Sequence, residues 1–77
     1  MKSPNVAFGK LVAGLRKAAR LSQEELAERA GLHRTYVSQV ERGLKSPTIV
    51  TLLRLSRALD TTPSKLMRQL EAELGGF

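Results

Sequence analysis

The side chains that could do catalytic or metal chemistry in this chain are few, and they form no recognisable set. His33 is the one histidine and there is no cysteine, so neither residue type can complete a transition-metal site around it. Glu24, Glu25 and Glu28 lie just after a helix start signal, where acidic side chains stabilise the helix dipole. No paired acid and base, no nucleophile with its base and no phosphate-binding glycine loop is present. The sequence therefore predicts a protein that is not an enzyme and that uses no metal or other cofactor.

The basic side chains are more numerous and are unevenly distributed. The 77 residues include 13 lysines and arginines, and the net charge is +6. Residues 1–20 contain basic side chains and no acidic one, and residues 31–59 contain Glu41 as their one acidic residue. An arginine such as Arg34 can offer two parallel donors to guanine O6 and N7 in the major groove of DNA. This pattern favours a polyanionic partner, nucleic acid in particular.

Hydrophobic spacing and helix start signals predict five helices and no strand. Ser22 and Glu25 form a capping box, Pro47 is expected in the first turn of the fourth helix, and Thr62 followed by Pro63 starts the last. The helices are expected at about 8–20, 23–30, 33–42, 47–59 and 63–74. Residues 1–7 would then be a short N-terminal arm, residues 8–74 one domain and residues 75–77 a tail.

Residues 21–43, LSQEELAERAGLHRTYVSQVERG, predict two short helices joined by a tight turn. Gly31 comes just after a helix end, where glycine adopts a positive φ at low cost. Ala27 is small enough for the second helix to cross closely over the first. Val37 and Val40 lie one turn apart and can both point into the core. The segment is therefore a helix-turn-helix unit, and the outer face of its second helix is free to contact a partner.

Several motifs at fixed spacings resemble the phage-repressor and Cro-like helix-turn-helix family, often called the Xre family. The resemblance covers about residues 8–70 and rests on Gln23, Ala27, Gly31, Val37, the sequence Glu41-Arg42-Gly43 and the sequence Ser46-Pro47-Thr48. Residues 33–38 also look like the recognition segment of restriction–modification controller proteins, which are small members of this family. The resemblance implies an all-α fold, a compact five-helix bundle of the lambda-repressor-like type. It further implies a homodimeric transcriptional regulator that places its third helix, about 33–42, in the major groove of a near-palindromic operator.

The resemblance also implies roles for individual side chains. Positions that face base edges correspond to Arg34, Thr35, Ser38 and Gln39. Positions at the groove edge, which touch base or phosphate, correspond to His33 and Tyr36. Positions that contact or adjoin phosphate correspond to Ser22, Gln23, Arg42 and Lys45. In related domains a basic residue at the position of Arg16 pairs with the acid at that of Glu41. For two of these residues a structural role stays open, since Tyr36 could pack in the core and His33 could be a polar residue near a helix start.

The last two helices carry more apolar side chains than one small core is expected to hide. We expect the remainder to form a dimer interface, made of Leu55, Leu66, Met67, Leu70 and Leu74. No apolar run approaches the length of a membrane span and no signal peptide is evident, so a cytoplasmic protein without a membrane partner or small-molecule ligand is expected. The alternatives are an antitoxin of the same fold, which would also bind a partner protein, the toxin, and a helical protein-interaction module without DNA function.

Overall fold

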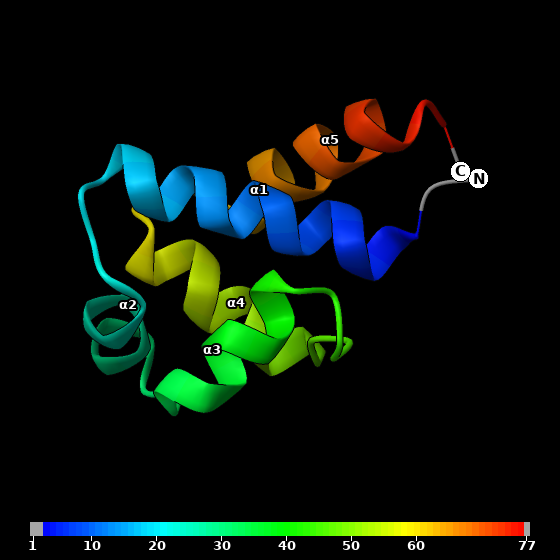
Figure 1. The fold of residues 1–77 in the computed structure, drawn as a ribbon. Helices are drawn as coiled ribbons and strands as arrows, with labels where there is room; N and C mark the ends of the chain where they lie inside the picture. Colours follow the sequence, from blue (N-terminus) through cyan, green and yellow to red (C-terminus); the bar gives the residue numbers. More distant parts are fainter. Residues whose placement is uncertain (1–2, 77) are drawn as a thin grey trace.

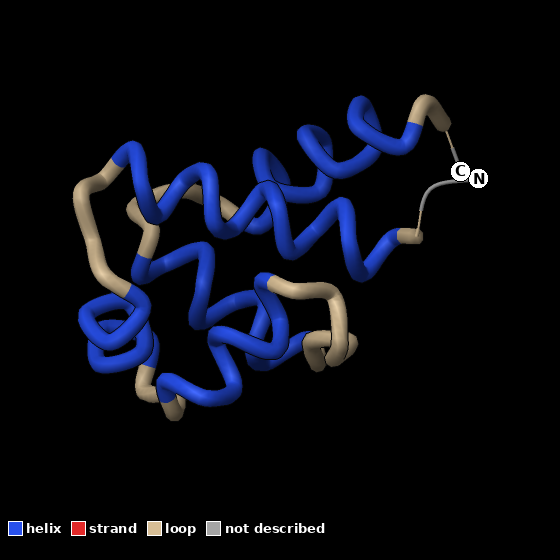
Figure 2. Tube along the Cα trace, viewed as in Figure 1, coloured by secondary structure: helices blue, strands red, loops and turns tan. Residues whose placement is uncertain are grey.

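The computed structural model describes residues 3–76, and within this range it consists of five α helices and no strand (Figures 1 and 2). The helices are α1 (Pro4–Ala18), α2 (Gln23–Ala30), α3 (Arg34–Glu41), α4 (Ile49–Ala58) and α5 (Pro63–Leu74). Helix α1 packs on α3 and α5, and α4 packs on α2 and α5, so that the α2–α3 pair is held from both sides. The predicted all-α, five-helix fold is confirmed.

Side-chain caps explain where four of these helices begin. Ser3, Ser22, Thr48 and Thr62 each accept a hydrogen bond from the backbone N–H three residues later. The predicted capping box is complete, since the N–H of Ser22 donates to Glu25 Oε1 at 2.9 Å and the N–H of Glu25 donates to Ser22 Oγ at 3.0 Å. The hydrogen bond from the Ser22 backbone lowers the pKa of Glu25 below its ordinary value. Local sequence therefore determines these starts.

Two expectations about helix starts were wrong. Helix α1 begins at Pro4 and not near Phe8, because Ser3 caps it and proline suits the first helical position, so residues 4–7 of the expected arm are helical. Pro47 precedes the cap residue Thr48 and lies in the loop before α4, not in its first turn. The rest of the expected arm, residues 1 and 2, and residue 77 of the expected tail lie outside the described residues.

The core is formed by the inward side chains of all five helices. It contains Phe8, Val12, Leu26, Ala27, Ala30, Val37, Val40, Leu55, Ala58, Leu59 and Leu66. Val37 and Val40 are both 1% exposed, as their spacing on one face of α3 predicted. Within residues 3–76 no helix is both long and apolar enough to cross a membrane.

Candidate nucleic-acid interface

Helix α3 presents a polar face outward because its opposite face is buried in the core. Arg34 and Thr35, its first two residues, are exposed, and Ser38 and Gln39 in the next turn are half-buried. His33, the N-cap, is also exposed, and its side chain makes no capping hydrogen bond. The side chains that the family resemblance assigns to base contact therefore lie on the accessible side of α3.

The turn before α3 has the left-handed glycine that its sequence predicts. Gly31 has φ +68° and ψ +36°, and the N–H of Leu32 donates to the carbonyl of Ala27 at 2.8 Å, which closes the end of α2. The carbonyl of Gly31 accepts a hydrogen bond from Nη1 of Arg54 in α4 at 3.3 Å. The sequence contains no signal for this contact, because Arg54 lies 23 residues further along the chain.

The end of α3 is tied to α1 and α2 through one carboxylate. The Nε of Arg16 donates to Oε2 of Glu41 at 2.7 Å and its Nη2 donates to Oε1 at 3.0 Å. The two side chains are 12% and 5% exposed, and this hydrogen bonding raises the pKa of Arg16 above its ordinary value. Arg16 Nη1 also donates to the carbonyl of Leu21 at 2.9 Å. The ion pair that the resemblance implied is therefore present, in a two-point geometry that fixes the orientation of both side chains.

Gln23 joins the same carboxylate, which the sequence did not predict. Its Nε2 donates to Oε1 of Glu41 at 2.9 Å, so three donors from two helices converge on one side chain at the end of α3. One N–H of the Gln23 amide is therefore already engaged within the protein. The first residue of α2 and the last residue of α3 are held together by this bond.

A close approach of α1 to the end of α3 depends on two glycines. A Cβ at Gly9, in the middle of α1, would lie 2.5 Å from the carbonyl oxygen of Glu41 and closer still to that of Val40. Gly43, just after α3, has φ +75°, and a Cβ there would lie 2.8 Å from the Cα of Val6. Both positions therefore require glycine. From the sequence alone, Gly9 is expected only to lower the stability of the helix.

The other candidate DNA-contacting residues differ in their surroundings. Tyr36 is half-buried and packs against the core cluster, as the structural alternative for this residue requires. Ser22 Oγ is engaged in the helix cap. Arg42 and Lys45 are exposed at and just beyond the end of α3, and Arg42 Nε donates to the carbonyl of Ser38 at 3.4 Å. Arg42 and Lys45 are therefore accessible cations at the C-terminal end of α3.

The expected dimer interface was wrong for two of its five residues. Leu55 and Leu66 are 1% and 0% exposed, because they face the core of the protomer and cannot contact a second copy. Met67 is 46% exposed, and Leu70 and Leu74 are half-buried. Three apolar residues of α4 that the sequence did not assign to the interface are also exposed, namely Ile49, Val50 and Leu53.

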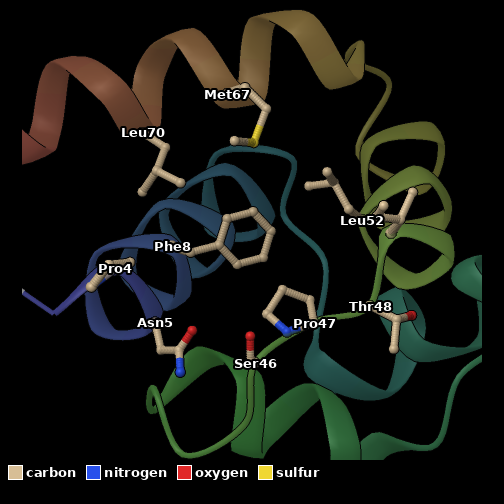
Figure 3. A pocket seen from close by; sticks show the side chains of 10 residues that line it. Pro4, Asn5, Phe8, Ser46, Pro47, Thr48, Leu52, Met67 and Leu70 are labelled. Carbon is tan, nitrogen blue, oxygen red and sulfur yellow. The ribbon is translucent and has the colours of Figure 1, made fainter. Parts of the chain in front are cut away.

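A hollow of about 200 Å³ lies between the start of α1, the loop before α4, and α5. Figure 3 shows Met67 and Leu70 pointing from α5 towards the ring of Phe8, with Pro47 on the other side of the ring. Its lining is almost entirely apolar, and Met67 and Leu70 also line a second, larger hollow that extends to Leu74. Met67 and Leu70 therefore line both hollows and Leu74 lines the second, whose lining also includes Ser64, Arg68 and Glu71.

Comparison with known proteins agrees with this geometry. The family model HTH_3, described as helix-turn-helix, matches residues 12–66. Control protein C.SmaI of Serratia marcescens is 48% identical over 56 residues, which cover 73% of this chain and 67% of that protein. The crystal structure of the restriction-modification controller protein C.AhdI from Aeromonas hydrophila has a TM-score of 0.81 and 45% sequence identity, covering 84% of this chain and 98% of that one.

A further structure shows the same fold at lower identity. The restriction-modification controller protein C.Esp1396I, solved as a tetramer in complex with its natural 35-base-pair operator, has a TM-score of 0.86 and 24% identity, covering 96% of this chain and 97% of that one. The helix-turn-helix geometry, the family match and the relatives agree. The chain therefore belongs to the HTH_3, Xre-like family of DNA-binding helix-turn-helix transcription regulators.

Proposed function

We propose that this protein binds a near-palindromic DNA operator as a homodimer and regulates transcription, with α3 in the major groove of each half-site. The observation that carries this proposal is that α3 has one face buried in the core and an opposite, polar face exposed. Val37 and Val40 fix one face in the core, while Arg34 and Thr35 are exposed at its start. In helix-turn-helix proteins the N-terminal residues of the second helix contact base edges. The net charge of +6 suits a polyanionic partner.

Base recognition is assigned to the outer face of α3. Arg34 would donate two parallel hydrogen bonds to a guanine, and Thr35 would contact the neighbouring base. Ser38 and Gln39, one turn further along, would reach bases nearer the centre of the site, and His33 would lie at the groove edge. Tyr36 is half-buried, and the part that stays exposed would contact base or phosphate at the groove edge.

Phosphate contacts are assigned to the two ends of the helix-turn-helix unit, which are the start of α2 and the residues just beyond α3. At the start of α2, next to Ser22 and Gln23, the first-turn N–H groups that the capping box does not use would be available to an anion, which a helix N-terminus favours. The second N–H of the Gln23 amide would add a donor there. Arg42 and Lys45 would contact the backbone beyond the other end of α3. These contacts would supply most of the affinity, and the bases most of the specificity.

Dimerisation is assigned to the apolar surface of α5 and α4 that the protomer leaves uncovered, which contains Met67, Leu70, Leu74, Ile49 and Leu53. A two-fold axis through such a patch makes it self-complementary. Two α3 helices related in this way would read half-sites about 34 Å apart, one helical turn of DNA. With DNA as its partner, the protein would act in the cytoplasm.

Replacing Met67 by glutamate should dissociate the dimer without unfolding the protomer. Met67 is 46% exposed in the protomer, so a charge is tolerated there, whereas in the dimer two carboxylates would be buried by symmetry. Sedimentation equilibrium should show the dissociation constant rising by about a hundredfold, since each lost methionine contact is worth roughly 1.5 kcal/mol or more. The control is Met67→Leu, which keeps the apolar surface. A glutamate variant that dimerises as tightly as the wild type would contradict this interface.

Selection of bound sequences from a random duplex pool at about 150 mM salt tests the function directly, because the salt concentration determines how much non-specific binding survives. We expect the selected DNA sequence to be palindromic. Arg34→Ala should then relax one symmetric pair of base positions at a cost of about 1–3 kcal/mol per half-site.

Lys45→Ala is the matched control for Arg34→Ala, because it removes a positive charge outside α3. It should weaken binding to all sequences alike. The slope of the logarithm of the binding constant against the logarithm of the salt concentration, the salt slope, should be smaller by about one per protomer. Failure of the pool to enrich any sequence, or equal loss at every base position with Arg34→Ala, would refute the proposed function.

A further inference from the structure

The turn between α2 and α3 is joined to α4 by a side chain distant in sequence. The hydrogen bond from Arg54 Nη1 to the carbonyl of Gly31 spans 3.3 Å. The guanidinium also lies alongside the turn, because a Cβ at Gly31 would be 3.5 Å from the same nitrogen. Helix α4 packs on α2 and α5 and contributes Leu55 to the core, so Arg54 projects from a well-anchored element.

The carbonyl of Gly31 is a backbone group of the turn that is not hydrogen-bonded within α2 or α3. The N–H of Gly31 still bonds to carbonyls of α2, those of Ala27 and Glu28, but its own carbonyl lies beyond the α2 ladder and before α3 begins. The donor for this carbonyl therefore comes from outside the helix-turn-helix unit. A cation beside a helix C-terminus is also favourable for the dipole of α2.

The start of α3 lacks the support that the other helices have. Its N-cap, His33, makes no side-chain cap hydrogen bond, whereas the N-cap side chains of α1, α2, α4 and α5 all do. Arg34 and Thr35 follow the cap directly, three and four residues after Gly31. Val37 and Val40 hold the rest of α3 in the core, so the turn is the support nearest to Arg34 and Thr35.

We propose that Arg54 is a positioning residue for DNA recognition, which holds the turn against α4 so that Arg34 and Thr35 keep their direction relative to the body of the protein. Arg54 acts through Gly31 and does not contact DNA. This inference rests on the proposed function, because it assigns Arg54 to base reading by α3.

The test compares Arg54→Met with Arg57→Met, which removes the same charge from another exposed arginine of α4. The probes are the duplex that wins the selection and a scrambled duplex of the same composition. Relative to Arg57→Met, we expect Arg54→Met to bind the selected duplex about threefold to tenfold more weakly, the effect of one hydrogen bond. Binding to the scrambled duplex and the salt slope should be the same in both variants.

Two DNA-binding outcomes would overturn the inference. Equal losses on both duplexes, with a salt slope lower by about one per protomer than in Arg57→Met, would make Arg54 a phosphate contact. Equal affinity of the two variants for the selected duplex would leave Arg54 without a role in recognition.

Amide hydrogen exchange of Leu32 and Val37, whose N–H groups donate to the carbonyls of Ala27 and His33 on either side of the turn, tests the same inference without DNA. Exchange should be faster in Arg54→Met than in Arg57→Met at equal Tm, because the turn opens locally. Unchanged exchange would overturn the positioning role. If the wild type selects no sequence, the proposed function fails by itself, and exchange still decides whether Arg54 holds the turn.

Discussion

Replacing Gly9 by alanine should destabilise the protein strongly, although alanine is the better helix former. The new Cβ would meet the carbonyl oxygens of Val40 and Glu41, which are main-chain atoms of α3 and cannot rotate away. Helices α1 and α3 would have to separate at the point where the end of α3 is held. We expect the free energy of unfolding to fall by about 2–3 kcal/mol in urea titrations, the upper part of the range for overpacking.

Gly14→Ala is the matched control, because Gly14 lies in the same helix and a Cβ there would meet no atom of another element within 4 Å. It should raise the free energy of unfolding by about 0.5–1 kcal/mol through helix propensity alone. Gly9→Ala should therefore lower the free energy of unfolding and Gly14→Ala should raise it, although both substitutions lie in α1. A Gly9→Ala variant as stable as Gly14→Ala would show that α1 and α3 do not pack as closely as described.

Replacing Glu41 by alanine should also cost much of the stability, because it leaves a cation without its partner. Arg16 is 12% exposed and gives two hydrogen bonds to Glu41, and Gln23 gives a third. Removing one member of a buried ion pair costs about 3–5 kcal/mol, of a total of roughly 4–12 kcal/mol for a chain of this length. Thermal and urea unfolding near neutral pH measure the loss.

The double variant Arg16→Met/Glu41→Leu separates the charge from the packing. Apolar replacements of similar size remove both charges, so the double variant should be more stable than Glu41→Ala alone. The pKa of Arg16 is raised in the folded state, so its contribution is complete below its unfolded pKa and is lost only as the pH rises through the folded value. The loss caused by Glu41→Ala should thus not diminish at mildly alkaline pH. A loss below about 0.5 kcal/mol, the usual range for surface substitutions, would contradict the role of the pair.

Prediction from sequence succeeded where the determining interactions are local. The capping box of Ser22 and Glu25, the left-handed Gly31 and the inward row of Val37 and Val40 all depend on residues within about four positions of one another. Capping energy, backbone sterics and helical periodicity act over that range. The start of α1 at Pro4 was missed although Ser3 and Pro4 form the same local signal as Thr62 and Pro63.

The sequence by itself therefore determined the helices, the turn and the family, because a short motif at fixed spacing specifies each of them. Only the tertiary structure decided which apolar side chains the protomer hides, since burial of Leu66 and exposure of Met67 depend on how α5 rotates against α1 and α4. It also decided that Gly9 contacts the main chain of α3, that Gln23 donates to Glu41 at the end of α3 and that Arg54 donates to Gly31 in the turn before it. Such contacts join residues distant in sequence, and the packing of whole helices brings them together.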